Sequence, residues 1–162
     1  MRGVAAASGR KRSERGLTLV ELIVAFTILA LLTSMAVPLA RYRVRIEQEK
    51  ELRYELRTIE KAIDDYKDAA LAGKIEVKLG TDGYPESLEQ LVKGVKLLQS
   101  ADGKVIKFLR RIPKDPMTNS YDWGLRSDQD EPDARSWGGQ NVFSVYTKSL
   151  EKARDGTPYS EW

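Results

Sequence analysis

The stretch "SERGLTLVELIVAF", residues 13–26, begins the longest apolar segment of the chain. A basic leader ends at Gly16, and almost every residue that follows is apolar. One carboxylate, Glu21, lies inside this apolar stretch. An ionised carboxylate is costly at membrane depth unless a positive charge pairs with it. The sequence therefore raises the question of what partner Glu21 has.

The apolar segment is long enough to cross a membrane. The 19 residues from Leu22 to Ala40 carry no formal charge, and a helix of that length reaches roughly 28 Å, close to the thickness of a bilayer core. The basic leader predicts a cytoplasmic N-terminus with the rest of the chain outside. Arg41, Arg43 and Arg45 follow the segment directly and oppose this orientation. We favour it nevertheless, because N-terminal helices with a basic leader usually insert this way.

Composition excludes several functional classes. The chain has 162 residues, enough for one anchored domain, and contains neither cysteine nor histidine. It therefore has no thiol nucleophile, no disulfide and no imidazole base or metal ligand. The net charge is +3, but residues 1–16 carry +4 by themselves, which leaves −1 for residues 17–162. A basic nucleic-acid-binding face is not indicated.

The junction at Gly16 carries a family resemblance. Gly16 followed by "LTLVELIVAFTILALLTSMAVPLA" resembles the class III signal of type IV pilins and type II secretion pseudopilins. The resemblance implies cleavage after Gly16 by a dedicated membrane peptidase, methylation of the new N-terminus at Leu17, and retention of the apolar helix. The family keeps a glutamate at the fifth mature position, here Glu21, and often a proline at the twenty-second, here Pro38. Its first mature residue is more usually Phe or Met, so Leu17 is a departure.

Two features of this helix predict a role in assembly. The α-amine created at Leu17 could neutralise Glu21 within one chain or between staggered neighbours. Helix geometry allows pairing within one chain and pairing between neighbours, and the resemblance implies the pairing between subunits. A tolerated acid near the membrane interface is the remaining alternative. Pro38 removes one backbone donor, which predicts a kink or a local loosening. That weak point could melt on assembly or simply bend the helix where it leaves the membrane.

An ordinary secretory signal is the competing interpretation of the N-terminus. Small residues from Ser34 to Ala36 fit a conventional cleavage site. Cleavage after Ala36 would release a soluble domain. The sharp junction at Gly16 and the acid at Glu21 count against it.

The chain beyond Ala40 predicts a helix and a small sheet. An apolar stripe with helical spacing predicts that the first helix continues to about residue 72, with its stripe packed on a domain of the same chain. Ala72-Gly73 would end it. The stripe consists of Leu52, Leu56, Ile59, Ile63, Tyr66 and Ala70.

The later segments predict shorter elements. Residues 73–84 are expected as a loop, and "YPESLEQLV" (84–92) as a short helix with Pro85 in its first turn and Gly94 at its end. Asp102-Gly103 between two apolar runs indicates a hairpin. "YDWGLRS" (121–127) and "NVFSVYTKS" (141–149) are expected as strands. The fold class is α+β, with a long N-terminal helix packed on a short helix and a small antiparallel sheet.

The C-terminal part extends the resemblance. "GYPESLEQLV", "RRIPKDPMTNSYDW" and "NVFSVYTKS" resemble the globular half of the major pseudopilin of type II secretion systems. The implied organisation is a cleaved leader (1–16), a membrane-spanning assembly helix (17–40) and a periplasmic pilin-like domain (41–162). The resemblance suggests one cofactor to consider, calcium, which major pseudopilins often bind after the last strand. It implies no other cofactor. That stretch here holds only Glu151, Asp155 and Glu161.

No other chemistry is indicated with comparable strength. Asp128, Asp130 and Asp133 could bind calcium, but a solvated loop is the stronger prediction and no metal site is expected. Glu60, Asp64 and Asp65 are expected on a solvated helix face rather than in an active site. The tryptophans are expected in the core or at subunit contacts; they are Trp123, Trp137 and Trp162.

These observations predict a structural protein and not an enzyme. The resemblance implies a subunit of a periplasmic pseudopilus that drives type II secretion, anchored in the inner membrane before assembly. Its implied partners are further copies of itself, minor pseudopilins, the prepilin peptidase and methyltransferase, and an inner-membrane platform with its ATPase. A type IV pilus subunit for adhesion, motility or DNA uptake is the nearest alternative. A secreted binding domain is the alternative from another class.

Overall fold

A computed structural model describes residues 18–98 and 103–162. The chain divides into two compact units, residues 1–43 and 44–162. The expected cleavage site, Gly16 and Leu17, lies outside the described residues, as does the leader. The expected domain boundary after Ala40 stays a prediction.

The predicted long helix is present as α1, Leu19–Leu71. Thr18 precedes it and accepts a hydrogen bond at its Oγ1 from the backbone N–H of Glu21, at 3.3 Å. The helix is continuous through Pro38, and the expected kink or loosening there stays a prediction. A proline removes only one hydrogen bond, which the neighbouring turns of a long helix can tolerate.

Helix α1 ends where the sequence predicts. Gly73 adopts a left-handed backbone, with φ of 62°, which glycine tolerates without the steric cost of a Cβ. The N–H groups of Gly73 and Lys74 donate to the carbonyls of Ala70 and Ala69, each at 3.0 Å. This pair of bonds is a Schellman motif, and it satisfies carbonyls that a helix end would otherwise leave without partners.

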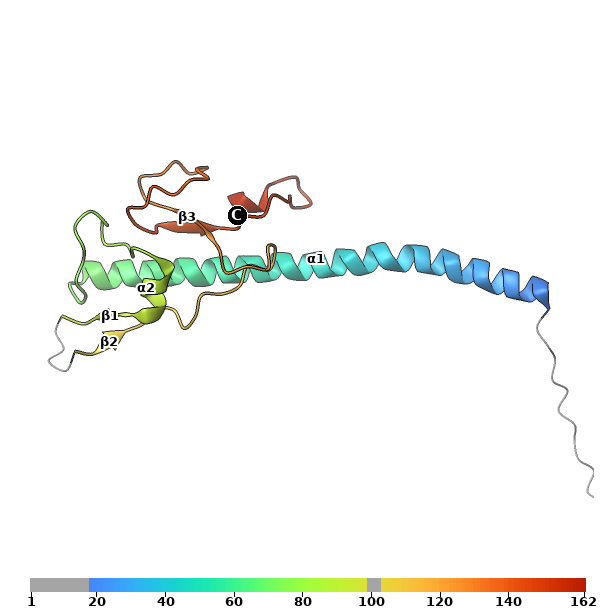
Figure 1. Cartoon of the computed structure of the whole chain (residues 1–162), viewed down its shortest axis with the longest axis horizontal. Helices are drawn as coiled ribbons and strands as arrows, with labels where there is room; N and C mark the ends of the chain where they lie inside the picture. The colour runs from blue at the N-terminus through green and yellow to red at the C-terminus, as the bar shows by residue number, and fades with distance from the viewer. Residues whose placement is uncertain (1–17, 99–102) are drawn as a thin grey trace, which may run out of the picture. The chain divides into compact units, whose positions relative to one another are not determined.

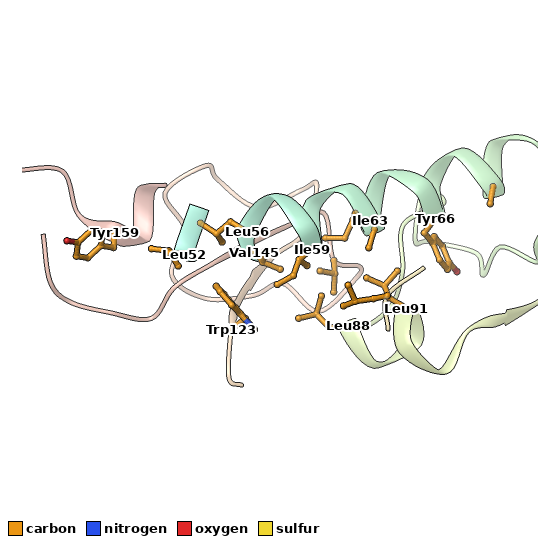
Figure 2. Close-up of a cluster of buried hydrophobic side chains, with 14 of the residues drawn as sticks. Leu52, Leu56, Ile59, Ile63, Tyr66, Leu88, Leu91, Trp123, Val145 and Tyr159 are labelled. Carbon is orange, nitrogen blue, oxygen red and sulfur yellow. The ribbon is translucent and has the colours of Figure 1, made fainter. Parts of the chain in front are cut away.

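The core of the second unit forms around the apolar stripe of α1, as predicted. Five stripe residues are buried, Ala70 is partly buried at the edge, and Ala62 and Ala69 widen the buried face. Figure 2 shows side chains from α1, from the short helix and from the C-terminal strands converging on one cluster. An amphipathic helix gains most of its stability from such packing. The labelled residues of the cluster are Leu52, Leu56, Ile59, Ile63, Tyr66, Leu88, Leu91, Trp123, Val145 and Tyr159.

The short helix is α2, Leu88–Lys93, which Figure 1 places beside the hairpin that follows it. Gly94 ends α2, as expected, with φ of 86°. Pro85 does not lie in the first turn, because Ser87 is the N-cap and the helix begins after it. The side-chain oxygen of Gln90 instead accepts a hydrogen bond from the N–H of Glu86, at 2.8 Å.

The expected single sheet is two separate two-stranded ladders. Strands β1 (Val95–Lys96) and β2 (Val105–Ile106) pair antiparallel, as the hairpin signal predicts; Asp102 itself lies outside the described residues. Strands β3 (Gly124–Arg126) and β4 (Ser144–Tyr146) form the second ladder, with Leu125 opposite Val145. A 3₁₀ turn at Tyr159–Glu161 closes the described chain. Ladders of two or three residues depend on the helix for their stability, because isolated hairpins are marginal in water.

Candidate assembly site

The first unit presents apolar side chains on all sides of α1. Residues 19–34 are exposed throughout, and α1 is the one candidate membrane span in the described part of the chain, with a mean hydropathy of 2.4 over an 18-residue window. A helix that is apolar all round is covered by lipid or by other helices. The first unit therefore requires a covering that lies outside the described chain.

Hydroxyl groups within the span are satisfied by the helix itself. Thr27 donates to the carbonyl of Val24 at 2.8 Å, and Thr33 donates to that of Leu29 at 2.7 Å. Ser34 makes the same kind of bond, to the carbonyl of Leu31 at 2.8 Å. A polar group without a partner is expensive in hydrocarbon. These three residues are thus compatible with lipid despite their polarity.

Glu21 occupies the first turn of α1 with its side chain exposed. Thr18 at the N-cap and Glu21 three residues later have the spacing of a capping box, and the bond from the Glu21 N–H to the Thr18 hydroxyl is one half of that motif. The sequence signal for this cap, a threonine three residues before a glutamate, was available and was missed. The carboxylate itself remains on the helix surface, where a group from another molecule can reach it. Because Leu17 lies outside the described residues, pairing between Glu21 and the Leu17 amine stays a prediction.

The C-terminal segment, residues 149–162, is held against the first turns of α1 within the second unit. Tyr159 is fully buried. Its hydroxyl donates to Glu49 at 2.7 Å and accepts from the Nε of Arg45 at 3.1 Å. Arg45 also forms an ion pair with Glu151. Arg53 lies over the ring of Trp162, with its guanidinium carbon 4.1 Å from the ring centre.

Burial of Tyr159 supplies most of this attachment. The Arg45–Glu151 pair is well exposed on both sides, at 44% and 62%, so it contributes about 0.5 kcal/mol. Full burial of an aromatic ring contributes about 2–3 kcal/mol. Burial raises the pKa of the Tyr159 hydroxyl, while the hydrogen bond from Arg45 acts in the opposite direction. The polar contacts therefore fix the position of a ring that is held by its own burial.

The acidic loop is engaged in hydrogen bonds to its own chain. Asp128 accepts from the side-chain amide of Asn141 at 2.8 Å. Asp130 accepts from the N–H groups of Ser127 and Gly138, at 2.7 and 3.1 Å. These two backbone bonds are the main reason that the pKa of Asp130 is lowered. Asp133 is exposed.

Calcium fits poorly to the acids that the sequence offers. No three acidic side chains of the described residues come together in a way that could hold a metal ion, whereas Ca²⁺ takes six to eight oxygens. In the C-terminal segment, Glu151 pairs with Arg45 and Asp155 binds Thr157. These two carboxylates are therefore engaged by groups of the described chain itself.

We therefore expect the folded domain to be indifferent to calcium. A site filled at a hundred times its dissociation constant would add about 2.7 kcal/mol and raise the melting temperature by roughly 10 °C. Thermal unfolding in millimolar calcium and in excess chelator, followed by circular dichroism, measures this. The two curves should coincide, with magnesium as the control for ionic strength. A rise that occurs with calcium alone would contradict the expectation.

The expected tryptophan roles are partly met. Trp123 is buried in the core and donates from Nε1 to the carbonyl of Pro113 at 2.9 Å. Trp137 is 40% exposed and donates to the carbonyl of Asn141.

A cleft of about 610 Å³ lies between α1 and residues 108–114 and is lined by acids and bases alike. Of the acids expected on a solvated face, Glu60, Asp64 and Asp65 are all exposed.

Comparison with known proteins places these features in a family context. Residues 11–37 match the prokaryotic N-terminal methylation motif, and this stretch includes Gly16, Leu17 and Glu21. The chain thus carries this methylation motif, which occurs in the type IV pilin family, followed by the long helix, short helix and small antiparallel ladders of an α+β fold that is consistent with a pilin-like fold.

A particular relative covers most of the chain. Over 133 residues the sequence is 28% identical to the type II secretion system core protein G of Vibrio cholerae, covering 80% of this chain and 83% of the relative. No solved structure matches the chain significantly. The similarity to the secretion protein therefore extends well past the N-terminal motif and into the second unit.

Proposed function

We propose that the protein is a structural subunit of a periplasmic pseudopilus that drives protein export by type II secretion. The observation that carries the proposal is the similarity to a secretion core protein over 80% of the chain, joined to a methylation motif at the N-terminus. The exposed apolar helix fits storage in the inner membrane before assembly and contact with other subunits afterwards.

Assembly in this proposal depends on Glu21. The first-turn carboxylate lies on the helix surface, and the α-amine of Leu17 in a neighbouring copy neutralises it inside the filament. Two opposite charges in a low-dielectric helix bundle stabilise each other, whereas either one alone is strongly unfavourable. Pro38 is proposed to help the helix adapt on assembly.

The remaining partners follow from the same proposal. The prepilin peptidase cuts after Gly16 and methylates Leu17. Minor pseudopilins and an inner-membrane platform with its ATPase assemble the filament, because the chain offers no phosphate-binding loop of its own. The proposed role is structural rather than enzymatic. Lys61 and Asp65 form an exposed ion pair on α1, as expected for a solvated helix face.

We expect the mature chain to begin at a methylated Leu17. Mass spectrometry of the protein purified from membranes should give the mass of residues 17–162 plus one methyl group. Gly16→Leu, which changes the cleavage junction and leaves the span intact, should accumulate at the unprocessed mass. A chain that begins at Val37 would contradict the proposal and support ordinary secretion.

Deleting the gene and assaying the culture distinguishes a pseudopilus from a surface pilus. The proposal expects exported proteins to be retained in the periplasm, with surface filaments unaffected, and complementation with the wild-type gene should restore export. Normal export with a loss of surface filaments would favour a type IV pilus subunit, which the N-terminal motif supports equally.

A further inference from the structure

Two arginines directly after the membrane span have no role in the fold. Arg41 and Arg43 are exposed on α1, and neither makes an ion pair or hydrogen bond in the described part of the chain. Arg45 differs from both, because it is bound to Glu151 and Tyr159 in the second unit. The first two arginines thus hold charges that the folded chain leaves available.

Their height along the helix matches the lipid headgroups. If Leu22–Ala40 fills the hydrocarbon core, Arg41 and Arg43 lie roughly 1.5 and 4.5 Å beyond its edge, at 1.5 Å per residue. Arginine side chains extend toward the headgroup layer from such positions. Tyr42, which is 45% exposed, stands between them, and tyrosine is enriched at this depth.

Helix geometry assigns the two arginines to different lipids. Residues two apart on an α-helix are rotated by roughly 200°, so Arg41 and Arg43 project from nearly opposite sides at nearly the same height. A planar guanidinium can bind two phosphate oxygens at once. The arrangement suits two separate phosphate groups around the helix rather than one shared between both arginines.

We propose that Arg41 and Arg43 form a collar that binds the headgroups of anionic phospholipids where α1 leaves the membrane. Anionic lipids are favoured over zwitterionic ones because their phosphate charge is not offset by an amine of the same headgroup. The collar holds the subunit at a fixed depth and must release its lipids before the helix can leave the bilayer. The inference rests on membrane anchoring by α1 and does not depend on which filament the subunit builds.

Native mass spectrometry of the full-length chain in detergent tests this inference. Phosphatidylglycerol or phosphatidylcholine is added, and the number and affinity of retained lipids are measured. We expect the wild type to prefer phosphatidylglycerol, and Arg41→Gln/Arg43→Gln to retain about two fewer molecules of it, with affinity falling about fivefold for each arginine. Every variant carries the same N-terminus, processed or not, so the contribution of that N-terminus cancels in the comparison.

Two matched variants separate specific binding from general charge. Lys96→Gln/Lys107→Gln removes two exposed charges from the second unit and should leave retention unchanged. Arg41→Lys/Arg43→Lys should keep most of the preference for phosphatidylglycerol. Unchanged retention in the arginine-to-glutamine variant, or an equal loss in the lysine-to-glutamine variant, would overturn the proposal. Unchanged retention together with a loss of filaments would instead assign the arginines to acidic groups on a second copy of the chain. Circular dichroism confirms that each variant is folded.

Discussion

We expect Glu21→Ala to abolish filament assembly while insertion and processing continue. Insertion depends on the apolar span, which the substitution makes more apolar, and processing depends on the junction at Gly16, which it leaves unchanged. In the filament, the amine of Leu17 would lose its counter-charge in a low-dielectric environment, at a cost of several kcal/mol per subunit. Because every subunit in the polymer bears this cost, assembly should fail outright.

The local structure separates this effect from damage to the helix. The Thr18 hydroxyl caps the backbone N–H of residue 21, and that bond does not involve the Glu21 side chain. Loss of an acid from the first turn costs only about 0.3–1 kcal/mol through the helix dipole. The helix should therefore still begin at the same place in the alanine variant, and the loss of charge pairing should dominate the result.

Counting filaments after overproduction, together with the amount of processed protein, gives the measurement. Glu21→Gln preserves shape and a weak acceptor but not the charge, so it should fail too, less completely. Thr18→Ala is the matched control for the cap, and it should reduce assembly far less than either change at Glu21. Normal filaments from both Glu21 variants would show that the carboxylate has no role in assembly.

The helix and its buried face could be predicted from the sequence because their signals are local. The spacing of Leu52, Leu56 and Ile59 defines one face of a helix whatever packs against it, and Gly73 ends that helix through its own backbone freedom. The strands at β3 and β4 were also predicted. The separation of the expected single sheet into two ladders, β1–β2 and β3–β4, was not predicted, since strands of two or three residues are too short to display an alternating pattern.

Contacts between distant residues could not be predicted in the same way. Arg45 and Tyr159 are 114 positions apart, and nothing in either local sequence specifies the other. At the candidate assembly site, by contrast, Glu21 could be singled out from the sequence alone, because it is the fifth residue after the junction at Gly16. The start of α2 was misplaced, since the N-cap is Ser87 and Pro85 lies before the helix. The Ser87 side chain makes no capping hydrogen bond, so no local capping signal explains this start.

Asp115 is a buried carboxylate that organises the loop before β3. It is fully buried, and one oxygen accepts from the N–H of Met117 at 2.8 Å. The other accepts from the hydroxyls of Thr118 and Thr147, at 2.8 and 2.6 Å. Because Thr147 follows β4 directly, the carboxylate joins this loop to the C-terminal strand. An aspartate before Pro116 is a local turn signal, but its bond to Thr147 spans 32 residues.

We expect Asp115→Ala to destabilise the domain by about 3–5 kcal/mol, a large part of the stability of an ordinary domain. The substitution leaves three donors without their acceptor, two of them hydroxyls that were bound to a charged group. Asp115→Asn should cost less, because an amide retains one acceptor and the threonine hydroxyls can rotate to accept from its NH₂ group. Asp133→Ala removes an exposed acid and should change stability by less than about 0.5 kcal/mol.

Urea unfolding of residues 41–162, which retain the whole core, measures these differences. A double-mutant cycle with Thr147→Val isolates the bond between the loop and the strand. Since Asp115 and Thr147 share a buried, charge-assisted hydrogen bond, their coupling should be about 1–3 kcal/mol. Additive effects of the two substitutions would mean that Asp115 acts through its own loop alone, and that the attachment to β4 rests on apolar packing.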